Sequence, residues 1–197
     1  SGAERVLSPP LSSLWLYGRE TVNLLGSGDF EAPLDQVEIP EGAKLVSGAA
    51  AGRPGQCLRV DVSPDTDAEK RPMPTVWFTP VRDAEGSPAA CLPAGEGVLS
   101  LSFLLKCDTV APGKFPSRVV RLVGAGKNHA GEPFFTDFLR ISGTRNWQRY
   151  EVQLVPGGNI PADVREFKVG IGNRGGSGTF WLDDVQLEAA ARATPFT

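Results

Sequence analysis

The sequence is poor in the residues and runs on which several common protein classes depend. It contains one histidine, His129, and no serine in a GxSxG motif, so we expect no Ser-His-Asp hydrolytic triad. No apolar run approaches the roughly 18 residues that a membrane-spanning helix needs. Lys and Arg number 20 against 23 Asp and Glu, and no block of like charge stands out. We therefore expect neither nucleic acid nor an anionic membrane as a partner.

Cysteine is also scarce and irregularly spaced. Cys57, Cys91 and Cys107 match no CxxC spacing, which argues against a thiolate metal site or a redox motif. Their odd number leaves at least one thiol unpaired. Two interpretations stay open: small apolar side chains in the core, or a disulfide between Cys91 and Cys107.

What the sequence does contain is short alternating segments separated by turn residues. Its 23 glycines and 17 prolines, together with 41% hydrophobic residues, indicate many turns between buried strands rather than disorder. Alternation of apolar and polar residues predicts strands in eight segments. They are GQCLRVDV (55–62), PTVWFTPV (74–81), GVLSLSFLLK (97–106), SRVVRLVG (117–124), FFTDFLRI (134–141), WQRYEVQLV (147–155), REFKVGIG (165–172) and TFWLDDVQL (179–187).

The apolar residues of these segments fall on one face of each strand. Those expected to point into the core include Leu99, Leu101, Phe103, Leu105, Phe167, Val169 and Ile171. No long segment carries a helical apolar stripe, and one turn around residues 11–15 is the most helix that we expect. Strands at regular spacing without intervening helices predict an all-β fold, a two-sheet antiparallel β-sandwich of the jelly-roll type.

The chain is expected to form one domain. Residues 21–190 make up the sandwich, residues 1–20 an N-terminal extension packed on it, and residues 191–197 a C-terminal tail. The first residues, SGAERVLSPP, lack the charged and then apolar order of a signal peptide, so we expect a mature or trimmed form.

Two patterns that suggest enzymes are better explained by a sandwich. The segment RVVRLVGAGKNHAG (118–131) lacks the third glycine of GxGxxG and no helix follows it, so we expect a hairpin loop. A glycosidase needs two facing carboxylates. Asp137, Glu132, Glu151 and Glu166 are candidates by residue type alone, and charged residues on sandwich strands usually lie on a solvated face.

Five segments, in order along the chain, carry a resemblance to a known family. They are NLLGSGDFE (23–31), GQCLRV (55–60), GVLSLSFLLK (97–106), TRNWQRYEV (144–152) and GTFWLDDVQL (178–187). With this set the chain resembles the galactose-binding-like jelly-roll carbohydrate-binding modules of families four, nine and twenty-two, over about residues 21–190. The resemblance implies a single β-sandwich in which a calcium ion ties the first strand to the last.

The last of these segments places two aspartates in an otherwise apolar strand. If Val185 and Leu187 face the core, alternation directs Asp184 outward and Asp183 inward beside Trp181. An ionised carboxylate in a buried strand costs several kcal/mol unless a partner neutralises it. Either a metal ion or backbone N–H groups at a β-bulge would stabilise Asp183.

The resemblance favours the metal ion. Calcium binds about six to eight oxygens from carboxylates and carbonyl groups. Asp29 and Glu31 flank an inward-facing Phe30, and with Asp183 they are the expected ligands. Because the ends of a domain usually lie close together, these residues can meet despite the long sequence between them.

A sugar-binding sandwich needs aromatic side chains on one sheet, with polar groups beside them to bind hydroxyls. The candidate binding residues are Trp77, Phe115, Phe135, Arg121 and Asp137. The resemblance implies a stacking tryptophan at Trp77 and assigns Trp147 to the core. A buried Trp77, and a solvated sheet face for the two charged residues, remain alternatives.

These observations lead to one functional hypothesis with two alternatives. We expect a non-catalytic module that binds a β-glucan-like or xylan-like carbohydrate and carries structural calcium. We also expect it to belong to a larger secreted or cell-surface protein, in an extracytoplasmic location. The alternatives are a structural or protein-interaction sandwich without a sugar site, and a glycan-active enzyme with two facing carboxylates.

Overall fold

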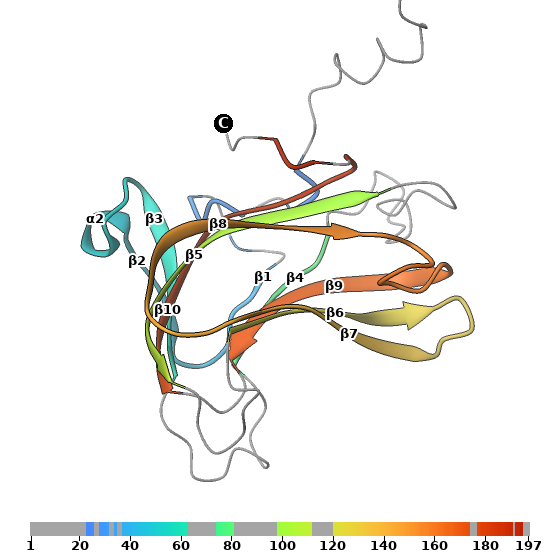
Figure 1. The fold of residues 1–197 in the computed structure, drawn as a ribbon, viewed down its shortest axis with the longest axis horizontal. Coiled ribbons are helices and arrows are strands. Elements are labelled where there is room, and N and C mark those ends of the chain that lie inside the picture. The colour runs from blue at the N-terminus through green and yellow to red at the C-terminus, as the bar shows by residue number, and fades with distance from the viewer. Residues whose placement is uncertain are drawn as a thin grey trace, which may run out of the picture.

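The computed structural model describes residues 23–25, 28–31, 34, 37–62, 74–80, 98–111, 120–173, 177–190 and 192–194. These residues form two antiparallel sheets of five strands each, which face one another as a sandwich (Figure 1). The all-β jelly-roll architecture predicted from the sequence is therefore confirmed.

Strand order defines the two sheets. Sheet A consists, in spatial order, of β1 (Val37–Glu38), β4 (Thr75–Phe78), β9 (Val164–Asn173), β6 (Val120–Asn128) and β7 (Pro133–Ile141). Sheet B consists of β2 (Ala43–Ser47), β3 (Gln56–Val62), β10 (Ser177–Glu188), β5 (Leu99–Ala111) and β8 (Arg145–Leu154). A single helical turn, α2 (Gly48–Ala51), follows β2.

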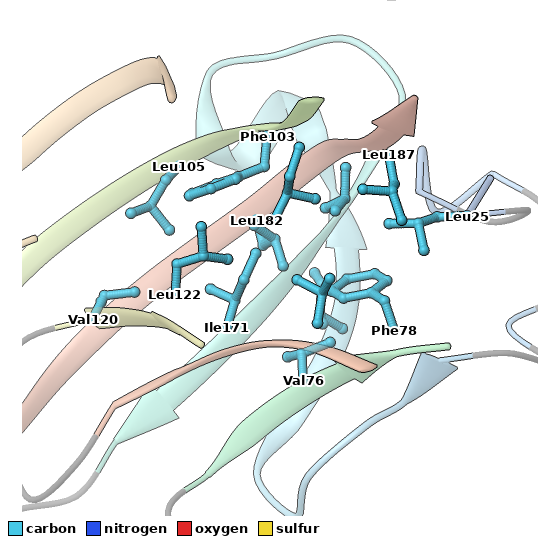
Figure 2. Close-up of a cluster of buried hydrophobic side chains, with 14 of the residues drawn as sticks. Leu25, Val76, Phe78, Phe103, Leu105, Val120, Leu122, Ile171, Leu182 and Leu187 are labelled. Carbon is cyan, nitrogen blue, oxygen red and sulfur yellow. The ribbon is translucent and has the colours of Figure 1, made fainter. Parts of the chain in front are cut away.

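The core lies between the inner faces of the two sheets, where the alternating apolar residues of each strand meet (Figure 2). Leu101, Phe103 and Leu105 on β5 are at most 1% exposed, and Val169 and Ile171 on β9 are fully buried. Complete burial of such a side chain stabilises the fold by about 1.5 to 3 kcal/mol. The inward faces predicted from alternation are confirmed at these positions.

A seam of hydrogen bonds ties the first described residues to the last strand. The side chain of Asn23 donates to the carbonyl oxygen of Val185 at 3.1 Å and accepts the N–H of Leu187 at 3.0 Å. Gly28 accepts the N–H of Val185 at 2.9 Å, and a Cβ at Gly28 would lie 1.7 Å from the carbonyl oxygen of that residue. Only glycine allows this approach, so the NLLGSGDFE segment joins the two ends of the sandwich through its backbone.

The eight predicted strands are all present, and two short ones, β1 and β2, were not predicted. The described part of the segment 118–131, residues 120–131, forms β6 and the turn that leads to β7, as expected for a hairpin. The N–H of Asn128 is bonded to the carbonyl oxygen of Glu132 at 3.0 Å. The expected helical turn near residues 11–15 lies outside the described residues. Among the residues described, no helix is long and apolar enough to cross a membrane.

Candidate functional site

The outer face of sheet A, which points away from the core, holds most of the predicted binding residues. Trp77 alternates on β4 with the buried Val76 and Phe78, and therefore points outward. Its register partner on β9 is Gly170. A Cβ at Gly170 would lie 2.6 Å from Cζ3 and 2.7 Å from Cε3 of the indole, so the ring lies against the glycine backbone.

Val123 shows how closely Trp77 lies on the sheet. Val123 is the β6 partner of Gly170 and also points outward, yet it is 0% exposed and lies outside the inner core. Its Cγ2 and the indole converge on the space above Gly170. Trp77 is therefore half-buried on the outer face, and the alternative of a tryptophan in the inner core is wrong.

A charged cluster lies on β6 and β7, on the same face of sheet A. The guanidinium of Arg121 donates to Asp137 through Nε at 2.7 Å, and its second nitrogen forms a further ion pair with the same carboxylate. Arg140 donates to Asp137 at 2.9 Å. The Arg121 guanidinium lies 6.0 Å from the ring centroid of Phe135, which is 55% exposed. A fixed cation thus lies beside an exposed aromatic ring.

Hydrogen bonds explain the acidity of Asp137. Burial raises the pKa of its carboxyl, but hydrogen bonds and charge from Arg121 and Arg140 outweigh burial, so the net pKa lies below the ordinary value. Asp137 is therefore an ionised acceptor that holds two guanidinium groups in place.

Trp77, Phe135, Arg121 and Asp137 thus lie on one face of one sheet, while Phe115 lies outside the described residues. Sequence reasoning missed Arg140, because a register shift between Leu122 and Val123 changes which residues of β7 face outward. It also missed the ion pair between Lys168 and Glu38, which joins β9 to the edge strand β1.

The outer face of sheet B is built from similar residues but is crossed by other parts of the chain. Trp147 donates from Nε1 to the carbonyl oxygen of Ala51 at 2.8 Å, and Lys106 donates to the same oxygen at 3.0 Å. The guanidinium of Arg53 lies 5.3 Å from the Trp147 ring centroid. Trp147 therefore lies half-buried beneath the turn after β2, and its assignment to the core is wrong.

The described part of the C-terminal tail crosses the other end of this face. Thr194 donates to both carboxylate oxygens of Glu188, from its N–H at 2.8 Å and its hydroxyl at 2.6 Å. Ser100 donates to the carbonyl oxygen of Ala190 at 2.8 Å, and the N–H of Ala193 bonds to Glu151 at 3.0 Å. Glu188 is 0% exposed as a result.

Known structures share this arrangement of sheets, although no family model and no curated protein matches the sequence. The C-terminal family 22 carbohydrate-binding module of Clostridium thermocellum Xyn10B has a TM-score of 0.56 and 15% identity, covering 87% of this chain and 98% of that one. The CBM22-1 xylan-binding domain of Paenibacillus barcinonensis Xyn10C has a TM-score of 0.54 and 12% identity, covering 85% and 94%. The fold is that of the jelly-roll carbohydrate-binding modules.

The three predicted calcium ligands, Asp29, Glu31 and Asp183, each contact other groups of the protein. Asp29 accepts the N–H of Glu31 at 3.2 Å, and Glu31 accepts the N–H of Gln56. Asp183 has one oxygen 2.8 Å from Nε of Arg53 and accepts the N–H of Asp184 at 2.8 Å with the other. In the described part of the chain, no three His, Cys, Asp or Glu side chains are grouped to hold a metal ion.

A β-bulge in β10 explains why Asp183 does not point into the core. The register with β5 shifts between Asp183 and Gln186, and Asp184 has a positive φ of 47°. Before the bulge Asp183 shares the outer face with Trp181, and after it Val185 returns to the core. The inward direction predicted for Asp183 is therefore wrong, because a bulge adds a residue and resets the alternation.

Asp183 is nevertheless buried, at 2% exposure, because the turn carrying Arg53 lies over it. Burial and, to a smaller extent, the neighbouring Asp184 carboxylate raise the pKa of its carboxyl to a net value of about 6. The N–H of Asp184 and the charge of Arg53 oppose that rise. Asp184 was expected to face water alone, but it is paired with Arg53 at 2.9 Å.

The observed contacts do not fit a calcium ion. A guanidinium already lies between Asp183 and Asp184, and a divalent cation placed there would be repelled by its charge. Glu31 and the carbonyl oxygen of Ala51 are each engaged by protein donors. Calcium takes about six to eight oxygens, and among the described residues no three acidic side chains are grouped here to supply them.

The carboxylates considered for catalysis are spread over the molecule. Glu151 is on sheet B, and Glu132 closes the β6–β7 hairpin. Asp137 and Glu166 share the outer face of sheet A, but their partners on β6 are Val123 and Lys127. Four residues along a strand span about 13 Å. That is more than the roughly 5 to 10 Å that separates the carboxylates of a glycosidase.

Two of the cysteines are buried thiols. Cys57 and Cys107 are at most 1% exposed and are free, whereas Cys91 lies outside the described residues. Burial raises the pKa of the Cys107 thiol to about 11, so it behaves as a small apolar side chain.

Proposed function

We propose that the chain is a non-catalytic carbohydrate-binding module that takes a β-glucan-like or xylan-like polysaccharide on the outer face of sheet A. The observation that carries this proposal is the joint placement of Trp77 and Phe135 on that face, with Arg121 and Asp137 beside them. Aromatic rings stack on the apolar faces of pyranose rings, and fixed polar groups bind hydroxyls.

The spacing of the two rings supports a chain-like ligand. Trp77 and Phe135 are on strands β4 and β7, which are separated by β9 and β6. Three strand spacings of about 4.8 Å place them about 14 Å apart across the sheet. This span suits an oligosaccharide of several units rather than a single sugar.

Some of the outward positions between the two rings carry small side chains or none. The β6 partner of Phe135 is Ala125 and the β9 partner of Trp77 is Gly170, while Lys168 and Val123 occupy the other two positions of these rows. Arg121, at 7% exposure, is held by Asp137 and cannot swing away, so little rotamer freedom is lost when a hydroxyl binds beside it.

The proposal assigns no catalytic role. Asp137 is bound by two arginines and has a lowered pKa, which suits neither a general acid nor a free nucleophile. Among the solved structures with this fold, one contains a CBM22-1 domain with a GH10 module and xylohexaose. By analogy, we expect this chain to work as part of a larger extracytoplasmic protein that acts on polysaccharide.

Affinity gel electrophoresis tests the proposal. The wild-type chain should be retarded by at least one gel containing xylan, β-glucan or mannan, relative to a gel without polysaccharide. Trp77→Ala should abolish the retardation, and Phe135→Ala should weaken binding about tenfold, which corresponds to loss of one stacking contact.

Leu45→Ala is the matched control for Phe135→Ala, because Leu45 is an exposed apolar side chain, at 40%, on sheet B. Its retardation should equal that of the wild type, and thermal unfolding should show that every variant is folded. Absence of retardation on all three polysaccharides would overturn the proposal in favour of an interaction sandwich without a sugar site. Equal retardation of wild type and Trp77→Ala would remove Trp77 from the site.

A further inference from the structure

The turn between β2 and β3 carries Arg53 to a fixed position over the bulge of β10. Its shape depends on Gly48, whose N–H bonds to Gly55 at 2.6 Å and whose carbonyl oxygen accepts the N–H of Arg53 at 2.7 Å. A Cβ at Gly48 would lie within 2.9 Å of three carbonyl oxygens of the turn. Gly52, with φ of 86°, ends the helical turn α2 just before Arg53. The backbone therefore sets the place of the arginine.

The guanidinium of Arg53 joins this turn to two consecutive carboxylates. Nε lies 2.8 Å from Asp183 Oδ2, and a terminal nitrogen donates to Asp184 Oδ2 at 2.9 Å. The N–H at Nε does not point at the Asp183 oxygen and has no hydrogen-bond partner among the described residues. The guanidinium thus lies between the two carboxylates as a shared counter-charge rather than as a two-pronged ligand of one.

The oxygens around this point already have cationic or N–H donors. The carbonyl oxygen of Ala51 receives Lys106 and Trp147, and Glu31 receives the N–H of Gln56. The turn, β5, β8 and β10 are therefore linked by two tethered cations, Arg53 and Lys106, and by the side chain of Trp147. A bound metal ion would link the same elements through the same kind of oxygen.

We propose that Arg53 is a built-in cation at this junction, and that the module folds and keeps its stability without calcium. A tethered guanidinium is always present, whereas stabilisation by a free metal ion depends on its concentration. The planar guanidinium fork of this arginine reaches both aspartates at once. Removing it leaves two adjacent carboxylates without their counter-charge, and a divalent cation can then bind to these carboxylates.

Thermal unfolding of the full chain tests the proposal. The Tm of the wild type should stay within about 1 °C in millimolar Ca²⁺ and in EDTA, since the cation position is filled. Arg53→Ser should lower Tm by about 10 °C in EDTA, because the aspartates lose their counter-charge. Millimolar Ca²⁺ should restore at least half of that loss, and calorimetric titration should show Ca²⁺ binding to the variant alone.

Two further variants keep the test decisive if Arg53→Ser is poorly folded. Arg53→Lys keeps the charge but loses the fork, so it should fall between wild type and Arg53→Ser and bind no Ca²⁺. Arg59→Ser is the matched control, because Arg59 pairs with Asp61 at 2.9 Å on the same face, and it should lose little stability and show no response to Ca²⁺. A wild-type Tm raised by Ca²⁺ or lowered by EDTA overturns the proposal. So does an Arg53→Ser variant of wild-type stability, or one that Ca²⁺ does not rescue.

Discussion

On the outer face of sheet B, Trp147 is hydrogen-bonded to the turn after β2 and its ring centroid lies 5.3 Å from the guanidinium of Arg53. On the outer face of sheet A, by contrast, Phe135 is 55% exposed. Both faces combine aromatic rings, arginines and aspartates. They differ in what lies over them. The turn before β3 and the C-terminal segment cross sheet B and use its polar groups. Within the described part of the chain, the contacts that hold Trp77, Arg121 and Asp137 come from sheet A itself.

The two faces also shift the pKa of an arginine-bound aspartate in opposite directions. The pKa of Asp183 is raised because burial and Asp184 together outweigh Arg53, whereas the pKa of Asp137 is lowered because two arginines outweigh burial. The comparison teaches that residue type alone does not distinguish a binding surface from an internal junction. The distinction depends on how many hydrogen-bond and charge partners each polar group has, and on whether another segment of the chain covers the face.

The largest effect should come from removing the covered tryptophan. Trp147→Ala deletes a hydrogen bond to the turn and the ring beneath Arg53, and should lower the free energy of unfolding by about 3 kcal/mol, measured with urea at neutral pH. Polysaccharide retardation of the folded variant should not change. The counterpart Trp77→Ala should cost about half as much stability but remove binding. Equal stability losses for the two would contradict the contrast between the faces.

The next effect is a pH dependence of stability from Asp183. Its folded pKa of about 6 lies above the ordinary 3.8, so between these values the folded state holds a proton that the unfolded state releases. The wild type should therefore lose stability relative to Asp183→Asn as pH rises from 4 to 6.5, by about 2 kcal/mol. The measurement is urea unfolding of both proteins across this range.

Asp61→Asn serves as the control for this pH series. Burial raises the pKa of Asp61, but hydrogen bonds from Thr179 and Arg59 and the charges of Arg59 and Lys44 lower it overall. Its difference from wild type should stay constant between pH 4 and 6.5. If Asp183→Asn behaves in the same way, the raised pKa assigned to Asp183 is wrong.

A smaller effect should follow from adding one carbon beneath Trp77. In Gly170→Ala the new Cβ would collide with the indole, so the ring must leave its place on the sheet. We expect a loss of about 1.5 kcal/mol in stability and severalfold weaker retardation by polysaccharide. Gly124→Ala is the matched control, since its Cβ would meet Phe138 and Phe167 on the inner face. It should destabilise the fold without changing affinity, and a parallel loss of affinity there would argue against a specific role for Trp77.

The smallest expected effect is a pH dependence of stability from Asp137, opposite in sign to that from Asp183. Its lowered pKa stabilises the fold above about pH 4, and that contribution is lost as pH falls through the folded value. The wild type should exceed Asp137→Asn by about 1 kcal/mol at pH 6 and approach it near pH 2.5. Urea unfolding at the two pH values measures the difference, and an advantage that grows on acidification would refute it.

The sequence predicted the strands well because alternation is a local signal. On β5 and β9 every second residue is apolar, and those residues fill the core. The two missed strands, β1 and β2, lie at sheet edges and have few buried side chains. The placement of Trp77 and Phe135 on one face followed from the same alternation once the strand order was known.

The junction at Asp183 could not be predicted in the same way. Arg53 lies in a glycine-rich and proline-rich turn with no periodic pattern, and it is 131 residues away from Asp184 along the chain. The adjacent aspartates signalled that a partner was needed, and a bulge was one of the open explanations. Neither signal indicates which distant side chain supplies the charge.

The sequence by itself therefore determined the strands, the inner faces and the existence of a single sandwich, since each depends on residues two positions apart. Only the tertiary structure decided that Arg53 lies against Asp183 and that Trp147 lies beneath a turn while Phe135 is exposed. These outcomes depend on strand order, one bulge and the path of two connecting segments, and contacts between residues far apart in sequence leave no periodic trace in it.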